Sequence, residues 1–232
     1  METNIVTDTA AQGTGQHEVG GRTVLIAGAS SAAGLTCASA LLDSGARVIA
    51  VGSNAEHLAT ARARHPGLET EQCDLADLTA VEALAARVHD RFGPVDGVIH
   101  LVGGWRGGGG LAGQSDEDWR FLESGFATLR NTTRVFDGDL LASAAGRLAM
   151  VSSTSVDNPL AGGANYAAAK AAAEAWTKAV GQGFRKAGAP AAAVIFVVKA
   201  LAGLEDELAA SVVDLWSTDA ARLNGSRIRL GA

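Results

Sequence analysis

The chain reads TVLIAGASSAAGLTCASALLDS over residues Thr23–Ser44. The apolar, β-branched run Thr23–Ala27 predicts a buried strand. Small residues then form a turn over Gly28–Gly34, and the alanine- and leucine-rich stretch Ala32–Ser44 predicts a helix. A continuous apolar strand that leads through a glycine turn into a helix is typical of α/β proteins, whose parallel strands are covered on both faces.

The rest of the chain repeats this alternation of strand and helix. Strands are predicted at Thr23–Ala27, Arg47–Val51, Leu68–Cys73, Gly97–Leu101, Arg147–Ser152, Ala192–Val198 and Arg227–Leu230. Helices are predicted between them at Ala32–Ser44, Ala55–His65, Leu78–Phe92, Asp116–Phe136, Leu160–Ala187 and Glu205–Ser217. Right-handed crossovers place helices on both faces of such a sheet, so we expect an α/β fold with a doubly wound, Rossmann-type parallel sheet of seven strands. A single domain is expected over residues 21–232, after a flexible N-terminal tail at residues 1–20.

Composition and charge exclude several classes of protein. The chain has 232 residues, 47% of them hydrophobic, and a net charge of −6, which allows a large core but no basic footprint for nucleic acid. No apolar run is long enough to cross a membrane, and residues 1–20 lack the pattern of a secretory signal. Cys37 and Cys73 have no metal-ligand spacing and are expected to be buried free thiols. We therefore expect a cytoplasmic protein without a metal site.

The glycine turn is a candidate phosphate site. A dinucleotide needs small residues here, so that the backbone approaches the pyrophosphate and the helix N-terminus faces it. Gly28, Ser30, Ser31, Ala32 and Gly34 are the candidate residues. A purely structural turn of small residues is the alternative interpretation.

The end of the second predicted strand bears on the choice of cofactor. It is followed by Gly52, Ser53 and Asn54, none of which is acidic. A carboxylate there would bond the ribose 2′-hydroxyl of NAD and repel a 2′-phosphate. NADP is therefore favoured, with Ser30, Ser53 and Asn54 as candidate phosphate donors. NAD stays the alternative, because the arginine that usually binds the 2′-phosphate is missing.

Tyr166 and Lys170 form a candidate acid–base pair. Tyr166 is the only tyrosine, and Lys170 follows it by four residues in an alanine-rich stretch, so both side chains share one helix face. An ammonium about 4 Å from the phenol, at an effective dielectric constant of about 20, favours phenolate by roughly 4 kcal/mol. This corresponds to a pKa lowered by about three units, towards neutrality. Such a tyrosine can protonate a carbonyl or remove a proton from an alcohol.

A serine supports this assignment. Ser153 precedes Tyr166 by thirteen residues, directly after a predicted strand. The carboxyl ends of parallel strands border the crevice where such folds bind ligands, so the Ser153 hydroxyl can stabilise charge on a substrate oxygen. The alternative is that Tyr166 packs in the core and Ser153 belongs to a turn.

The combination resembles the short-chain dehydrogenase/reductase family, in which a serine stands thirteen residues before a Tyr-x-x-x-Lys motif on a long helix. The resemblance covers roughly residues 22–230. It implies an enzyme, an NAD(P)-dependent oxidoreductase that transfers a hydride between nicotinamide and a small carbonyl or alcohol substrate. Tyr166 would be the acid/base and Ser153 would orient the substrate oxygen. Lys170 would lower the tyrosine pKa and bond the nicotinamide ribose.

The resemblance also assigns further cofactor contacts. Gly103 is kept from the family's motif after the fourth strand, and Asp74 matches the acidic residue that contacts the adenine amino group. A helix cap or turn is the alternative role for Asp74. Ala32 replaces the middle glycine of the family's turn. If that position required a positive φ, alanine would cost roughly 1–2 kcal/mol.

Several positions depart from the family pattern. Gly125 and Phe126 stand where the relay asparagine is expected, and Asn131 lies too far along the helix. His100 begins the segment that replaces Asn-Asn-Ala, and a structural role is expected for it. Val198–Ala200 replaces Pro-Gly, and little sequence follows to cover a substrate. These losses keep a second hypothesis open, a dinucleotide-binding sensor or scaffold with weak or no turnover.

Two further expectations concern a loop and an assembly. Residues 103–110 read GGWRGGGG and form either a mobile flap beside the site or a plain surface loop. The small residues of the stretch Leu160–Ala187 allow close helix packing. By the family resemblance they predict a homodimer or homotetramer, and packing on the chain's own sheet is the alternative.

Overall fold

The computed structural model of the protein describes residues 18–231. Its centre is a sheet of seven parallel strands in the order β3-β2-β1-β4-β5-β6-β7. The strands are β1 (Thr23–Ala27), β2 (Arg47–Gly52), β3 (Glu69–Gln72), β4 (Gly97–His100), β5 (Arg147–Ser153), β6 (Ala192–Val198) and β7 (Arg227–Arg229). The strand order reverses between β1 and β4, as in doubly wound sheets, so the predicted fold class is confirmed.

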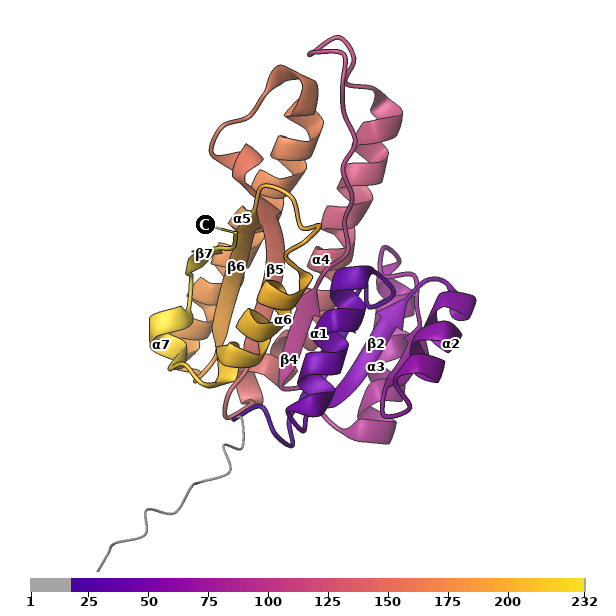
Figure 1. The fold of residues 1–232 in the computed structure, drawn as a ribbon. Helices are drawn as coiled ribbons and strands as arrows, with labels where there is room; N and C mark the ends of the chain where they lie inside the picture. The colour runs from indigo at the N-terminus through magenta and orange to yellow at the C-terminus, as the bar shows by residue number, and fades with distance from the viewer. Residues whose placement is uncertain (1–17, 232) are drawn as a thin grey trace, which may run out of the picture.

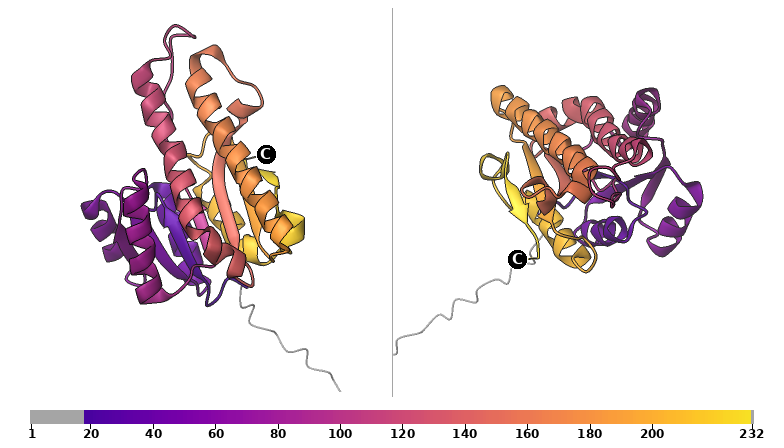
Figure 2. Two further views of the ribbon diagram at one scale, coloured as in Figure 1. Left: turned by 180° about the vertical axis from the view of Figure 1, so that it is seen from behind. Right: turned by 90° about the horizontal axis from the view of Figure 1, so that it is seen from above.

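Helices cover both faces of this sheet (Figures 1 and 2). They are α1 (Ala32–Asp43), α2 (Ala55–Arg64), α3 (Leu78–Phe92), α4 (Asp116–Ala142), α5 (Ala164–Ala187), α6 (Glu205–Val213) and α7 (Ala220–Leu223). One core cluster joins α1, α2 and α6 to the sheet through Leu41, Leu58 and Leu208. A second cluster joins α3, α4 and α5 to the other face through Leu84, Phe136 and Phe184.

Local sequence explains where these elements begin. All seven residues of β6 are buried, which matches its unbroken apolar run. Ser31, Asn54 and Ser115 cap α1, α2 and α4 by accepting a backbone N–H with the side chain. Because the strands are parallel, their carboxyl ends lie at one edge of the sheet. This edge holds the glycine turn, the end of β5 and the start of α5.

The helix boundaries differ from the predictions by more than one residue in three places. α4 continues past Phe136 to Ala142, because the Asp139 carboxylate accepts the Val95 N–H (3.0 Å) and pairs with His89. The helix predicted over Leu160–Ala187 begins only at Ala164, after a 3₁₀ turn. The last predicted helix ends at Val213, and the short α7 follows it.

The start of the folded part also differs slightly from expectation. Residues 1–17 of the expected tail lie outside the described residues, whereas residues 18–20 form a turn and Val19 is fully buried. Cys37 and Cys73 are buried free thiols, as predicted. Across residues 18–231, no helix combines the length and apolar character needed to span a membrane, and no cluster of His, Cys, Asp or Glu is arranged to hold a metal ion.

Candidate active site

Two adjoining clefts lie at the carboxyl edge of the sheet. One, of about 400 Å³, is lined by Gly28, Ser30, Ser31, Ser53 and Asp74 among others. The second, of about 410 Å³, is lined by Ser153, Tyr166 and Lys170. The segment 101–103 lines both clefts, so they adjoin each other, and we refer to them together as the groove. The structure therefore brings the glycine turn and the candidate catalytic residues to the same groove.

The glycine turn has a backbone that only small residues permit. Gly28 has a φ of +85°, and a Cβ there would lie 2.9 Å from the Leu101 carbonyl carbon. A Cβ on Gly34 would lie 2.6 Å from the Ala29 Cα, so neither position tolerates a side chain. Ala32 is the first residue of α1 and its φ is not positive. The cost considered for alanine at this position therefore does not arise.

Ser31 holds the turn against α1. Its hydroxyl accepts the Gly34 N–H (3.1 Å) and donates to the Gly28 carbonyl (3.0 Å). This leaves the small residues of the turn facing the groove at the N-terminus of α1, where a phosphate is favoured electrostatically. The residues present therefore fit the pyrophosphate of a dinucleotide.

The part of the groove beside the glycine turn contains Ser30, Ser53 and Asp74. The Asp74 carboxylate accepts the Ala76 N–H (2.9 Å), so this residue also shapes a turn, as its alternative interpretation predicts. Asn54 caps α2 through its side-chain oxygen, which accepts the His57 N–H (3.0 Å), and it does not line the cleft. Ser53 is thus better placed than Asn54 for a 2′-phosphate.

Ser153, Tyr166 and Lys170 come from two neighbouring elements. Ser153 ends β5 and is 2% exposed, and its hydroxyl accepts the Ser155 N–H and donates to the Ser155 hydroxyl, both at 3.1 Å. Tyr166 and Lys170 lie on the first turns of α5. The Lys170 Nζ donates to the Val151 carbonyl (2.8 Å) and lies 5.9 Å from the centre of the Tyr166 ring.

This arrangement corrects the expected effect of Lys170 on Tyr166. Burial raises the pKa of Tyr166, and a hydrogen bond from Ser153 only partly opposes the rise. The predicted lowering towards neutrality is wrong for this arrangement. The prediction assumed an ammonium about 4 Å from the phenol. The ammonium is instead directed to the carbonyl of Val151.

Lys170 itself has a shifted pKa. Burial lowers the pKa of this lysine to about 8, and the negative charge of Glu174 opposes the change. At neutral pH the Lys170 amine is still protonated, but its pKa lies only slightly above this pH.

We expect this lysine to make stability depend on pH. An unfolded lysine has a pKa of about 10.4, so between about pH 8 and pH 10.4 the unfolded chain binds a proton that the folded protein lacks. The free energy of unfolding therefore rises with pH across this window. Below the window the lysine is protonated in both states, and the buried charge destabilises the folded protein to its full extent. Urea unfolding at about pH 7 and about pH 10 measures the change. Lys170→Met should lack this component, and equal pH dependence in both proteins would contradict it.

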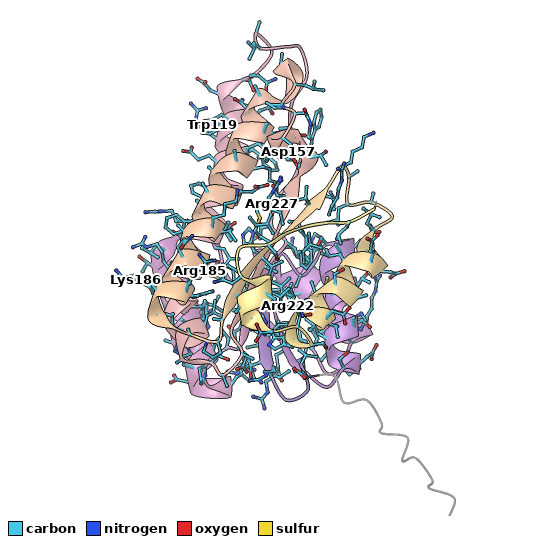
Figure 3. All side chains as sticks on the ribbon, turned by 90° about the vertical axis from the view of Figure 1, so that its left-hand side faces the viewer. Trp119, Asp157, Arg185, Lys186, Arg222 and Arg227 are labelled. Carbon is cyan, nitrogen blue, oxygen red and sulfur yellow. The ribbon has the colours of Figure 1, made fainter. Side chains whose placement is uncertain are left out.

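Glu174, a carboxylate that the sequence analysis did not single out, forms a hydrogen bond and an ion pair beside the site. Glu174 is 2% exposed, and its oxygens accept the Ser152 hydroxyl (2.7 Å) and pair with the Arg227 guanidinium (3.0 Å). Arg227 also pairs with Asp157 at 3.0 Å (Figure 3). The network ties α5, β5 and β7 together beside Ser153. A charged residue four places after Lys170 in an alanine-rich helix was the available signal.

A second missed residue, Gln114, holds the glycine-rich loop. Its amide nitrogen donates to the carbonyls of Gly108 (3.0 Å), Gly110 (3.1 Å) and Gly162 (3.1 Å). Its amide oxygen accepts the N–H of Asn165 (3.1 Å), the residue before Tyr166. The loop expected to be a flap or a plain surface loop is thus attached to the segment that leads into α5.

The residues that depart from the family pattern have other partners. Asn131 is buried and donates to the carbonyls of Leu75 and Ala76, so it does not reach the groove. His100 is also buried, and its Nε2 lies 2.9 Å from the Thr128 hydroxyl. Burial and the charge of Lys170 lower the pKa of His100 to about 3, so its ring is neutral at ordinary pH.

Comparison with known proteins bears on this site. The family described as short chain dehydrogenase matches residues 22–203. A putative ketoacyl reductase of Streptomyces coelicolor is 34% identical over 68% of this chain, and a 2,3-dihydro-2,3-dihydroxybenzoate dehydrogenase of Bacillus subtilis is 30% identical over 69%. The matched segments cover 62% and 63% of these relatives' own lengths, which is less than two thirds.

Solved structures share the fold at lower sequence identity. An NADPH-bound short chain oxidoreductase of Pseudomonas aeruginosa with an atypical catalytic centre has a TM-score of 0.79 and 21% identity, covering 90% of this chain and 94% of its own. An L-sorbose reductase of Gluconobacter frateurii, complexed with NADPH and L-sorbose, has a TM-score of 0.80 and 19% identity, covering 93% and 97%. At these identities the likeness concerns the fold alone.

Proposed function

The chain belongs to the short-chain dehydrogenase family of oxidoreductases, and we propose that it transfers a hydride between NADP(H) and a small carbonyl or alcohol substrate. One observation carries this proposal. Ser153, Tyr166 and Lys170 line one cleft, and this cleft adjoins the one lined by the glycine turn.

In the direction of reduction, NADPH held in the groove would supply a hydride for the carbonyl carbon. Tyr166 gives its phenolic proton to the carbonyl oxygen, which yields the alcohol and the oxidised cofactor, and solvent returns the proton. The Ser153 hydroxyl binds the same oxygen and stabilises its developing charge. Because burial raises the pKa of Tyr166, the phenol is protonated at neutral pH, which suits a proton donor.

The proposed cofactor contacts follow the groove. Gly28, Ser31 and Gly34 would receive the pyrophosphate at the N-terminus of α1, where Ala32 begins the helix. Asp74 would bind adenine, Gly103 would border the nicotinamide, and Lys170 with Tyr166 would bind its ribose. Ser30 and Ser53 would bind the 2′-phosphate, whereas Asn54, which caps α2 outside the cleft, is given no contact. NADPH in two structures of the same fold is consistent with this choice, and NAD is the alternative.

We expect Ser53→Asp to weaken NADPH binding by at least about tenfold. A carboxylate about 6 Å from the 2′-phosphate repels it by roughly 3 kcal/mol at an effective dielectric constant of about 20, and screening reduces this to nearer 1.4 kcal/mol, or tenfold. Fluorescence titration with NADPH and NADH measures both affinities. Ser53→Asn is the matched neutral control. Equal losses for both cofactors, or for both variants, would argue against a phosphate site at Ser53.

The function itself is tested by binding and turnover together. NADPH and NADH are titrated into the protein, and the oxidation of each is then followed with aldehydes, ketones and quinones. Turnover with any substrate of this panel supports the oxidoreductase proposal. Cofactor binding without any turnover would instead favour the sensor or scaffold hypothesis, for which Phe126 at the relay position is the specific observation.

We also propose a homodimer or homotetramer that uses the outer faces of α4 and α5. A hollow of about 390 Å³ lies between these helices, with Trp176, Ala179 and Gly183 among its lining residues. The small residues allow a second copy to approach closely. Light scattering coupled to size-exclusion chromatography measures the assembly.

A further inference from the structure

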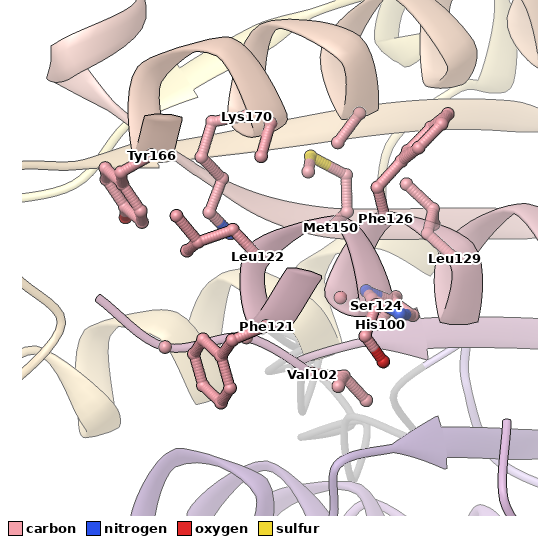
Figure 4. Close-up of a pocket in the computed structure, with 15 residues that line it drawn as sticks. His100, Val102, Phe121, Leu122, Ser124, Phe126, Leu129, Met150, Tyr166 and Lys170 are labelled. Carbon is pink, nitrogen blue, oxygen red and sulfur yellow. The ribbon is translucent and has the colours of Figure 1, made fainter. Parts of the chain in front are cut away.

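A separate cavity lies behind the candidate catalytic residues. It has a volume of about 190 Å³ and is lined by α4, α5, the end of β4, Met150 in the middle of β5 and the segment 102–104. We call it the side chamber. Figure 4 shows Tyr166 at one end of the side chamber and Phe126 with Leu129 at the other. It is thus a pocket that runs inward between the two helices.

The side chamber adjoins the cleft that contains Ser153. Tyr166, Lys170 and the segment 102–104 line both spaces. Gly103 and Gly104 lie between the two spaces and have no side chains that would separate them. A Cβ at Gly104 would lie 2.9 Å from the Phe121 ring, and one at Gly103 would lie 3.4 Å from the Lys170 Nζ. A group attached to a carbonyl at Tyr166 can therefore extend into the side chamber.

The space exists because the facing residues of the two helices are small or turned away. Phe126 packs edge-to-face against Trp176, with ring centres 6.2 Å apart. Gly125 has no side chain, and beyond Tyr166 and Lys170 the helix α5 presents the small residues Ala169 and Ala173 to the cavity. Side chains of ordinary size at these positions would fill the gap.

The walls select an apolar occupant. Phe121, Leu122 and Met150 are among the apolar side chains that line it, and two of its polar groups are already engaged. The Nε2 of His100 is bonded to the Thr128 hydroxyl, and the Lys170 Nζ donates to the Val151 carbonyl. A polar group placed against these apolar walls would lose hydrogen bonds to water without replacing them.

The volume limits the size of this occupant. A cavity of roughly 150 Å³ is large enough to bind benzene, so about 190 Å³ admits one six-membered ring and excludes two fused rings. An aromatic ring is favoured over a saturated one, because the Lys170 ammonium at the wall of the side chamber can interact with a π face.

We infer that the side chamber binds the ring of an aryl ketone or aryl carbinol whose reacting carbon lies at Tyr166. The inference rests on the proposed reductase activity and names its substrate class. The carbonyl group is attached directly to the ring, since Tyr166 borders the side chamber itself.

The test compares acetophenone with butanone as substrates and NADPH as cofactor. Acetophenone has four more apolar carbons, so its kcat/KM in the wild type should exceed that of butanone by at least about tenfold. Cyclohexyl methyl ketone should fall between them. A kcat/KM for butanone that equals or exceeds that of acetophenone would overturn the inference.

Variants inside and outside the side chamber test whether it causes the preference for acetophenone. Ala173→Leu fills the side chamber and should reduce kcat/KM for acetophenone at least about tenfold more than for butanone. Ala171→Leu makes the same change at an exposed position of α5 and should leave the preference as in the wild type. Leu122→Ala enlarges the side chamber and should raise activity with 2-acetylnaphthalene relative to acetophenone. Equal effects of Ala173→Leu on both ketones would refute the inference.

A binding readout separates this inference from the proposed reaction. Calorimetric titration with acetophenone should show binding to the wild type and to Ala171→Leu, and at least about tenfold weaker binding to Ala173→Leu. If binding follows this pattern and no ketone is reduced, the side chamber stands and the reductase proposal falls. If ketones are reduced and acetophenone binds Ala173→Leu as well as the wild type, the side chamber does not hold the ring. Thermal melting confirms that each variant is folded.

Discussion

Tyr166→Phe is expected to lower kcat by about 10²–10⁴-fold, because that is the contribution of a positioned proton donor. The phenol is the only tyrosine hydroxyl in the chain, so no second tyrosine can replace it. The ring itself remains, and with it the lining of the groove and of the side chamber. The affinity for NADPH should therefore change by no more than a few-fold. Steady-state kinetics and fluorescence titration measure the two quantities separately.

The matched control for this variant is Ser155→Ala. Ser155 borders the same cleft and bonds Ser153, but we propose no proton transfer for it. Its loss should cost far less than the loss of the Tyr166 hydroxyl. Equal activity of Tyr166→Phe and the wild type would overturn the mechanism. A large loss of NADPH affinity in Tyr166→Phe would show that the hydroxyl contributes mainly to cofactor binding rather than to proton transfer.

Glu174→Ala is expected to destabilise the fold by about 3 kcal/mol. Removing one partner of a buried ion pair leaves an uncompensated charge, at a typical cost of about 3–5 kcal/mol. The lower end applies because the Arg227 side chain is 30% exposed and keeps Asp157 as a second partner. The Ser152 hydroxyl also loses its acceptor. For a chain of this size, the melting temperature should fall by roughly 6–12 °C.

Two controls separate the ion pair from simple packing. Lys178 also pairs with Glu174, and its side chain is 51% exposed. Lys178→Ala should therefore lower the free energy of unfolding by less than about 1 kcal/mol. The double variant Glu174→Leu with Arg227→Met replaces the pair by apolar groups and should regain most of the lost stability. A loss in Glu174→Ala no larger than in Lys178→Ala would show that the network contributes little.

Much of the fold could be predicted from the sequence, because buried parallel strands have a distinct composition. The apolar runs of β1 and β6 gave their boundaries without error. The end of α4 was missed, since Asp137 and Gly138 suggest a helix end and the Asp139 contacts come from residues about 45 positions away. Local sequence carries no record of such distant partners.

In the candidate site, too, local sequence predicted some features, whereas others depend on residues distant in the chain. The spacing of Ser153, Tyr166 and Lys170 placed the three residues at one cleft, because strand ends and helix faces follow from local geometry. The direction of the Lys170 ammonium could not be inferred, since it depends on the Val151 carbonyl of β5. For the same reason the spacing could not give the sign of the pKa shift of Tyr166.

Gln114 has a practical consequence for protein engineering. One carboxamide joins the loop after β4 to the segment before α5, although the two are separated by about fifty residues. They therefore constitute a single exchangeable module. A graft that transferred residues 103–115 without residues 160–165 would leave Gln114 facing foreign backbone, and would disturb the helix start that carries Tyr166.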